Sequence, residues 1–176
     1  MVKEQTMKLL IGVFWLFLSG FIYSNEYRLG SGDQIIITVY NESDLTTKIK
    51  IDKTGLVSFP FLDDVQVIGL TTKQVANIIH TGLLGDYIVN PQVSVSVAIY
   101  RPFFIHGQVK RPGGIPFQDD LTLDKAIALA GGLALRASTS DWKITRIVNG
   151  KTVTIQANVA TQVQPDDIIK IEQSFF

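Results

Sequence analysis

The stretch from Gln92 to Tyr100 alternates between apolar and polar or small residues, and no other segment limits the possible folds so strongly. Its apolar positions are Val93, Val95, Val97 and Ile99. Side chains of a β-strand alternate between the two faces of a sheet, so this segment is expected to be a strand with one covered and one open face. The fold must then supply a second layer that covers the valine face.

Other short runs are rich in β-branched and aromatic residues, which favours further strands. These are expected at residues 33–40, 48–51, 56–59, 103–109, 115–117, 143–148, 151–156 and 167–171. The Asp52–Gly55 segment has the length of a hairpin turn between two of them, with Gly55 at positive φ, and Pro60 ends the pairing. Asn149-Gly150 is the strongest hairpin signal in the chain.

Two segments have helical periodicity. Thr71 and Gln74 are spaced as a capping box for a helix over residues 71–84, which ends at Gly85. Its expected inner face carries Val75, Ile78, Ile79 and Leu83. A second, shorter helix is expected to be capped by Thr122, with Leu123, Ala126, Ile127 and Ala130 inward, and to end at Gly131-Gly132.

These elements predict an α+β protein made of two small modules, each a mixed sheet with one helix on one face. The boundary is expected at Arg101-Pro102, which gives modules at residues 25–100 and 101–176. The order in the second module is strand, turn, strand, helix, hairpin and strand, which suits a β-grasp arrangement. No convincing internal repeat is visible.

The N-terminus has the features of a secretory signal peptide, predicted to cover residues 1–24. Lys3 and Lys8 precede an apolar run, and Ser24 offers a small residue for cleavage. The run is about 15 residues long even when extended to Tyr23, whereas a bilayer span needs roughly 20. An uncleaved membrane anchor is the alternative. The chain has no cysteine, so it is not expected to be a lipoprotein and it lacks the residue for a disulfide or a thiolate metal site.

Composition argues against several other classes of protein. There are 16 basic and 16 acidic residues, so no nucleic-acid partner is expected. The two histidines, His80 and His106, lack a cluster of further ligands or a catalytic partner nearby in sequence, so no metal site, cofactor or catalytic residue is predicted.

Carboxylates occur in three adjacent pairs, namely Asp63-Asp64, Asp119-Asp120 and Asp166-Asp167. Glycoside hydrolysis needs two carboxyl groups that face one cleft, and adjacent residues of a strand point to opposite faces. Turn formation explains the pairs better than catalysis does. The chain is therefore predicted not to be an enzyme.

Aromatic and basic residues near the boundary are candidates for carbohydrate contact. Arg101, Lys110 and Arg111 are expected to cluster around the junction, where they could face an acidic polymer, and Tyr100 lies beside them in sequence. For each aromatic candidate, packing in the core is the simpler explanation, and a solvated rim is the default for the cations.

Several motifs, taken in order, resemble the outer-membrane polysaccharide export family. Tyr27-Arg28-Leu29 with Gly32-Asp33, then Asp52 with Gly55 and Phe59-Pro60, then Asn90-Pro91, resemble the blocks of its export domain. The segment from Gly107 through Pro112-Gly113, and the helix block that ends at Gly131-Gly132, resemble a soluble-ligand-binding β-grasp (SLBB) domain. The family often has Pro-Gly-Asp where this chain has Pro165-Asp166-Asp167, and we expect the turn here to be less strained.

The resemblance implies a periplasmic, ring-forming subunit of a capsular or exopolysaccharide export machine. Its implied partners are the polysaccharide, further copies of itself, and an inner-membrane co-polymerase that regulates chain length. Because no remaining segment has the length and apolar face of a membrane-spanning helix, a separate outer-membrane β-barrel is expected to supply the pore. A monomeric periplasmic glycan-binding module and a polymer-trimming enzyme are the competing hypotheses.

Overall fold

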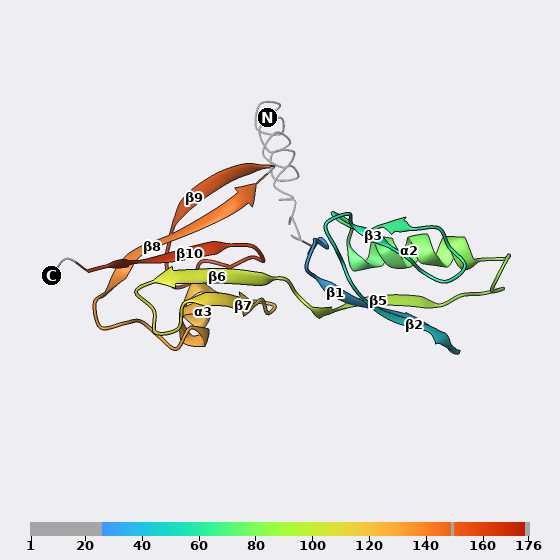
Figure 1. Ribbon diagram of the computed structural model, residues 1–176, viewed down its shortest axis with the longest axis horizontal. Coiled ribbons are helices and arrows are strands. Elements are labelled where there is room, and N and C mark those ends of the chain that lie inside the picture. Colours follow the sequence, from blue (N-terminus) through green and yellow to red (C-terminus); the bar gives the residue numbers. More distant parts are fainter. Residues whose placement is uncertain (1–25, 149, 175–176) are drawn as a thin grey trace, which may run out of the picture.

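The protein is an α+β structure with two sheet-and-helix modules, as the sequence predicts. The computed structural model describes residues 26–148 and 150–174, so the predicted signal peptide lies outside the described residues. The modules lie side by side along the long axis of the molecule (Figure 1). Each has its own hydrophobic cluster, one formed within residues 27–97 and the other within residues 103–171.

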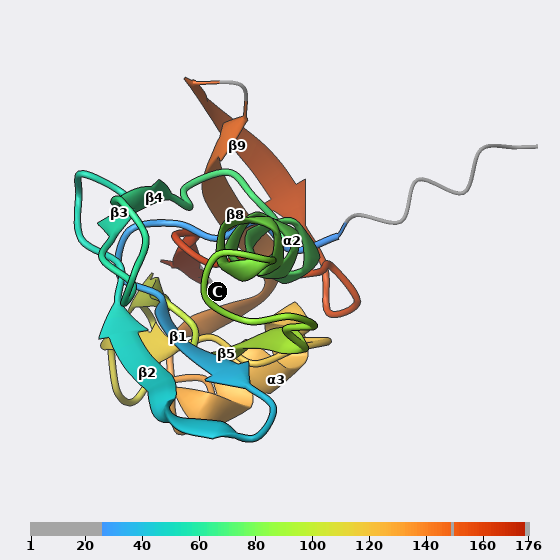
Figure 2. The same cartoon turned by 90° about the vertical axis from the view of Figure 1, so that its right-hand side faces the viewer.

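The first module is a three-stranded antiparallel sheet in the order β2-β1-β5, formed by Glu42–Lys50, Gln34–Val39 and Val93–Ile99. Helix α2 (Thr72–Leu83) lies across one face of this sheet (Figure 2). β5 is the alternating strand, and its valines are the partly buried positions that pack against the cluster beneath α2. This is the covered face that the period-2 pattern predicts for the valines, whereas Ile99, at the end of the strand, is 49% exposed and the expectation for it is wrong.

Helix α2 begins where the capping box predicts. Thr71 Oγ1 accepts the backbone N–H of Gln74, and the Gln74 side chain accepts the backbone N–H of Thr71. Val75, Ile79 and Leu83 are buried, but Ile78 is not. The expectation for Ile78 is wrong because it lies on the flank of the helix, where 43% of its surface remains exposed.

The expected hairpin around Asp52–Gly55 does not form. β2 pairs with β1, and β3 (Leu56–Val57) pairs with β4 (Val65–Gln66) instead. Gly55 does have positive φ, 74°, and the Asp52 carboxylate accepts the backbone N–H groups of Thr54 and Gly55. The segment is therefore a local turn that redirects the chain between two different sheets.

The second module is a five-stranded mixed sheet in the order β7-β6-β10-β8-β9, with α3 (Leu123–Leu129) packed against its buried face. Its strands are β6 (Pro102–Gly107), β7 (Gly113–Pro116), β8 (Ala137–Val148), β9 (Lys151–Ala157) and β10 (Ile168–Gln173). β6 and β10 are parallel and the other neighbours antiparallel, which fits the predicted β-grasp arrangement. The predicted hairpin around residue 150 joins β8 to β9. Thr122 is the N-cap residue of α3, but its hydroxyl donates to Asp124 and makes no capping bond to the backbone.

Gly107 is a position where the close approach of two strands requires glycine. Its φ is +88°, and a Cβ placed there would lie 2.2 Å from the carbonyl oxygen of Ile171. Gly150, in the β8–β9 turn, has a similar φ of +74°, but beyond its chain neighbours no atom of the described residues lies within 4 Å of the place that a Cβ would take. A side chain at Gly150 would therefore meet backbone strain alone, whereas one at Gly107 would meet both strain and a steric clash.

We predict that Gly107→Ala lowers the free energy of unfolding by more than about 3 kcal/mol, because the new methyl group forces β6 away from β10. Gly150→Ala should cost roughly 1 kcal/mol, from the strained φ alone. Urea denaturation of both variants measures the difference. Equal losses would contradict the assignment of Gly107 to a close backbone approach.

Candidate functional site

A buried carboxylate lies at the junction of the two modules. Asp33 directly precedes β1 and has no exposed surface. It accepts four hydrogen bonds, from the backbone N–H of Gly30 (2.8 Å), the backbone N–H of Arg101 (2.8 Å), the Tyr27 hydroxyl (2.6 Å) and Nη1 of Arg101 (2.9 Å). Both carboxylate oxygens are thereby hydrogen-bonded and Arg101 supplies the opposite charge, which is the condition for a stable buried charge.

Arg101, in the two-residue connection between β5 and β6, holds this carboxylate and also reaches the second module. Its Nε donates to Asp166 at 2.5 Å, and its Nη1 also donates to the Tyr27 hydroxyl at 2.7 Å. The guanidinium passes so close to Gly30 that a Cβ there would lie 2.6 Å from it. We call the set Tyr27, Asp33, Arg101 and Asp166 the junction clamp.

The junction clamp shifts the titration of its members. Burial and the hydrogen bond to Asp33 raise the pKa of Tyr27, so its hydroxyl stays a donor at neutral pH. Burial alone would lower the pKa of Arg101, but Tyr27 and the hydrogen bond to Asp166 outweigh it and the pKa is raised. Both groups therefore keep the protonation states that the clamp needs.

A second aspartate in the chain repeats the geometry of Asp33. Asp167, directly before β10, is fully buried and is held by Arg146 through Nε (2.7 Å) and Nη2 (2.6 Å). Its Oδ2 accepts the backbone N–H three residues earlier, from Gln164, just as Asp33 accepts that of Gly30. The sequence offered no visible repeat, but the turn before each central strand is built in the same way.

The residue before each buried aspartate has positive φ: Gly32 at 100° and Asp166 at 66°. The expectation that the Pro165-Asp166-Asp167 turn is less strained is therefore wrong. Glycine reaches this region freely, whereas aspartate does so at a cost. In return, the Asp166 carboxylate forms the exposed arm of the junction clamp.

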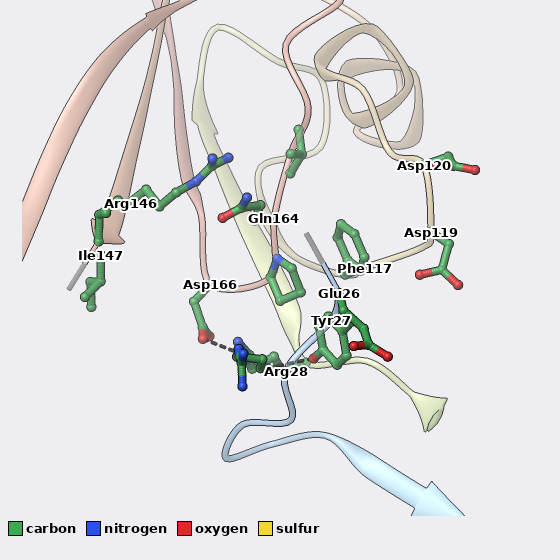
Figure 3. Close-up of a pocket in the computed structure, with 14 residues that line it drawn as sticks. Glu26, Tyr27, Arg28, Phe117, Asp119, Asp120, Arg146, Ile147, Gln164 and Asp166 are labelled. Atoms are coloured by element: carbon green, nitrogen blue, oxygen red, sulfur yellow. Dashed lines mark hydrogen bonds and ion pairs between the residues drawn. The ribbon is translucent and has the colours of Figure 1, made fainter. Parts of the chain in front are cut away.

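A cleft of about 1070 Å³ lies beside the junction clamp (Figure 3). Its walls come from residues 26–28, the loop after β7, the end of β8 and the loop before β10. The lining residues are Glu26, Tyr27, Arg28, Arg101, Phe117, Asp119, Asp120, Arg146, Ile147, Val148, Val163, Gln164, Pro165 and Asp166. Sequence reasoning missed this cleft because its walls are far apart in the chain.

Tyr100 supports one wall of the cleft from behind. Its ring packs edge-on against Tyr27 and Phe117, with centroids 4.9 and 5.6 Å away. Its hydroxyl donates to Asp119 at 3.0 Å. Burial and this hydrogen bond raise the pKa of Tyr100 to about 12. The aromatic cluster fixes the position of Phe117 at the cleft.

The expected cluster of Arg101, Lys110 and Arg111 does not form. Arg101 precedes β6 and the other two follow its far end, six strand residues away, and a strand rises about 3.3 Å per residue. Lys110 and Arg111 instead pair their backbone N–H groups with the carbonyls of Gly132 and Ala130, and both side chains are exposed. Of the four candidates for carbohydrate contact, Arg101 and Tyr100 lie at the junction and Lys110 and Arg111 do not.

The other motif residues shape turns. Gly113, Gly131 and Gly132 have φ values of +147°, +81° and +90°. Pro91 is buried and its carbonyl oxygen lies 2.7 Å from Nδ1 of His80, whereas Pro60 and Pro112 are exposed in turns. Within residues 26–148 and 150–174, no three acidic or histidine side chains form a group that could hold a metal ion. Nor does any helix in this part of the chain combine the length and apolar character needed to cross a bilayer.

Two family models match the two modules in order. One, described as "Polysaccharide biosynthesis/export protein", matches residues 23–98, and the other, described as "SLBB domain", matches residues 102–156. Together they cover about three quarters of the chain. The chain therefore belongs to the polysaccharide export proteins that join one export domain to one SLBB domain.

A curated relative adds a specific likeness. The exopolysaccharide production protein ExoF of Rhizobium meliloti is 33% identical over 122 residues, which is 62% of this chain. The match spans only 29% of that relative's length. The likeness supports the family and leaves the role of this chain to be proposed.

We predict that Arg101→Met lowers the free energy of unfolding by roughly 3 kcal/mol, because it leaves the buried Asp33 charge without its counterion. Arg111→Met is the matched control, since that guanidinium is exposed and, among the described residues, has no buried counterion and donates only to the carbonyl oxygen of Leu129. It should change stability by less than about 1 kcal/mol. Chemical denaturation measures both. Equal effects would show that the junction clamp adds nothing to stability.

Asp166 allows a second test of the clamp. Asp166→Gly should change stability by less than about 1 kcal/mol, because relief of the positive φ offsets the loss of an exposed ion pair. Asp166→Ala loses the ion pair and keeps the strain, so it should destabilise by about 1–2 kcal/mol. If urea denaturation finds the alanine variant as stable as the glycine variant, the strain at this position is absent.

Proposed function

We propose that this chain is a ring-forming periplasmic subunit of a capsular or exopolysaccharide export machine, and that it conducts the polymer toward a separate outer-membrane pore. The observation that carries the proposal is the order of its two modules, an export domain followed by an SLBB domain. The name of the relative from Rhizobium meliloti supports the polymer class. The subunit acts without catalysis, by shape and by contact with other proteins.

The proposed location and partners follow from the same class. Residues 1–24 direct export, residues 25–100 and 101–176 are the two domains, and no lipid is attached because the chain has no cysteine. Its partners are the polysaccharide, further copies of itself, an inner-membrane co-polymerase and an outer-membrane β-barrel. The junction clamp supports this role, because a ring subunit must hold its two domains in one orientation to close a symmetric assembly.

A ring needs two different surfaces that fit each other, because its contacts run head to tail. Two apolar surfaces on different modules are candidates. The first, the loop surface, has Phe61 stacked on Tyr87 with centroids 5.0 Å apart, together with Val89, which is 90% exposed. The second, the sheet surface, has Phe104 and Ile168 as paired neighbours on the open face of the second sheet, each nearly half exposed.

We propose contact with the polymer for the four residues that the sequence suggested, which lie at two separate places in the structure. Lys110 and Arg111 are exposed at the far end of β6, where they can meet a charged polymer. Arg101 and Tyr100 lie at the junction, but their polar atoms are engaged by Asp33, Asp166 and Asp119. Their contribution would come from shaping the surface around the cleft.

A monomeric glycan-binding module is the second candidate, and the cleft beside the junction clamp favours it. The two functions differ in self-association. A glycan-binding module needs no contact between copies, whereas an export ring depends on it.

The proposal is tested by the mass of the purified protein, alone and with its envelope partners, and by polysaccharide export in a deletion strain. We expect a closed oligomer, loss of exported polymer on deletion, and rescue by the wild-type gene. Phe104→Ser with Ile168→Ser should abolish both oligomer and rescue. Leu135→Ser is the matched control, because that leucine is fully exposed and lies on neither surface. A strict monomer under all conditions, with export unchanged by deletion, would overturn the proposal.

A further inference from the structure

The cleft beside the junction clamp holds side chains whose polar atoms have no partner among the residues that the structure describes. Within the described part of the chain, the side chains of Glu26, Asp120 and Gln164 line the cleft and make no hydrogen bond. Asp119 uses one oxygen for the Tyr100 hydroxyl. Convergent polar groups in a concave surface are the usual mark of a ligand site, and the cleft volume lies just above the usual range of roughly 300–1,000 Å³.

Two of the three cations of the cleft are already paired with carboxylates. Arg146 is paired with the buried Asp167, and Arg101 is held between Asp33 and Asp166. Arg28 is the third cation, and its Nη1 donates to the carbonyl oxygen of Gly69. The guanidinium groups of Arg101 and Arg146 are therefore paired with carboxylates, and that of Arg28 is hydrogen-bonded to the backbone.

The anions of the cleft outnumber these cations. The lining has three arginines and four carboxylates, Glu26, Asp119, Asp120 and Asp166, with Asp33 and Asp167 buried behind it. The site has a net negative charge, and its field repels an anionic ligand at distances within a Debye length of about 10 Å. An acidic polymer, which the basic residues of the sequence had suggested, does not suit this place.

An apolar surface completes the cleft. Phe117 lies between Gln164 and Asp119 in the view of Figure 3, and Ile147 and Val163 also line the cleft. An aromatic ring offers a flat apolar face, against which the C–H face of a pyranose ring packs. Carboxylates around it accept hydroxyl hydrogen bonds that are stronger than those between neutral groups.

We propose that this cleft binds a short segment of uncharged sugar residues, with Phe117 beneath a sugar ring and Glu26, Asp119, Asp120 and Gln164 holding its hydroxyl groups. The inference rests on the proposed function, because it names the chemistry of the polymer that the export subunit meets at this site. The ion pairs of Arg101 and Arg146 fix the walls before the ligand arrives, which reduces the entropy lost on binding.

The test is calorimetry or NMR titration of the full chain at low ionic strength, with two kinds of probe. The first is a panel of uncharged gluco-, galacto- and manno-oligosaccharides, and the second is an oligogalacturonate of the same length. We expect saturable binding of at least one uncharged probe, at least tenfold tighter than that of the acidic probe. Equal or tighter binding of the acidic probe, no saturable binding of any uncharged probe, or cleavage of a probe would overturn the inference.

Variants locate the site. The double variant Asp119→Asn with Asp120→Asn should weaken binding of the uncharged probe at least threefold. It should also lower the ratio of the affinity for the uncharged probe to that for the acidic probe. Asparagine tolerates the positive φ of residue 120, which is 56°, so the turn is retained. Asp86→Asn is the matched control, an exposed carboxylate of the first module outside the cleft, and should leave both affinities unchanged. Equal effects of the double variant and the control would remove the cleft as the site.

Phe117 packs partly against the core, so Phe117→Ala could lower stability as well as affinity. Gln164→Ala is the companion variant, because the fold uses only its backbone N–H and carbonyl, both hydrogen-bonded to Asp167, and the substitution keeps both. It should weaken binding at least twofold without changing the thermal midpoint. Gln164→Ala with unchanged affinity would contradict the proposed contact. If the oligomer and export tests fail while binding persists, the export role is wrong and the site stands. If the oligomer and export tests succeed but no uncharged probe binds, the export role stands and only the proposed sugar site is wrong.

Discussion

The structure depends on one buried carboxylate, that of Asp33, and on the arginine that neutralises it. An ionised carboxylate without water is costly unless it is paired and fully hydrogen-bonded, and Asp33 meets both conditions through Gly30, Tyr27 and Arg101. Because Arg101 lies in the connection between the modules and also binds Asp166, the same interaction that buries Asp33 ties the first module to the second. The two modules, each with its own buried cluster, are therefore coupled by these ion pairs as well as by the ring contacts of Tyr100 with Tyr27 and Phe117.

Asp167 and Arg146 repeat this arrangement inside the second module. In both places an aspartate accepts the N–H three residues before it and directly precedes a strand flanked by neighbours on both sides. The device differs at one position, where Asp166 takes the conformation that Gly32 takes in the first module. The backbone of Asp166 is strained by its positive φ, but its carboxylate forms an additional ion pair with Arg101 that links the two modules.

The same pairing decides the character of the cleft. Arg101 and Arg146 are both paired with buried carboxylates, so the surface left for a ligand in the cleft is acidic and partly aromatic. Residues at the far end of β6, Lys110 and Arg111, keep their charges exposed. One chain can thus present two surfaces of opposite charge to a polymer or to partner proteins, about one strand length apart.

The sequence by itself determined features set within a few residues. The capping box of Thr71 and Gln74, the positive φ of Gly55 and the alternating strand β5 were predictable, because a short-range hydrogen bond, a steric limit or the strand period dictates each. The ordered motifs also indicated the α+β class and the family. None of these depends on which distant segments meet.

The tertiary structure alone decided which segments pair and which charges meet. The strand after Gly55 pairs with β4 rather than with β2, because strand pairing follows the packing of the core and not proximity in sequence. Arg101 meets Asp33 across 68 residues, and Arg146 meets Asp167 across 21. A charge pattern cannot reveal such partners, since the energy of an ion pair depends on distance and burial, which exist only after the chain has folded.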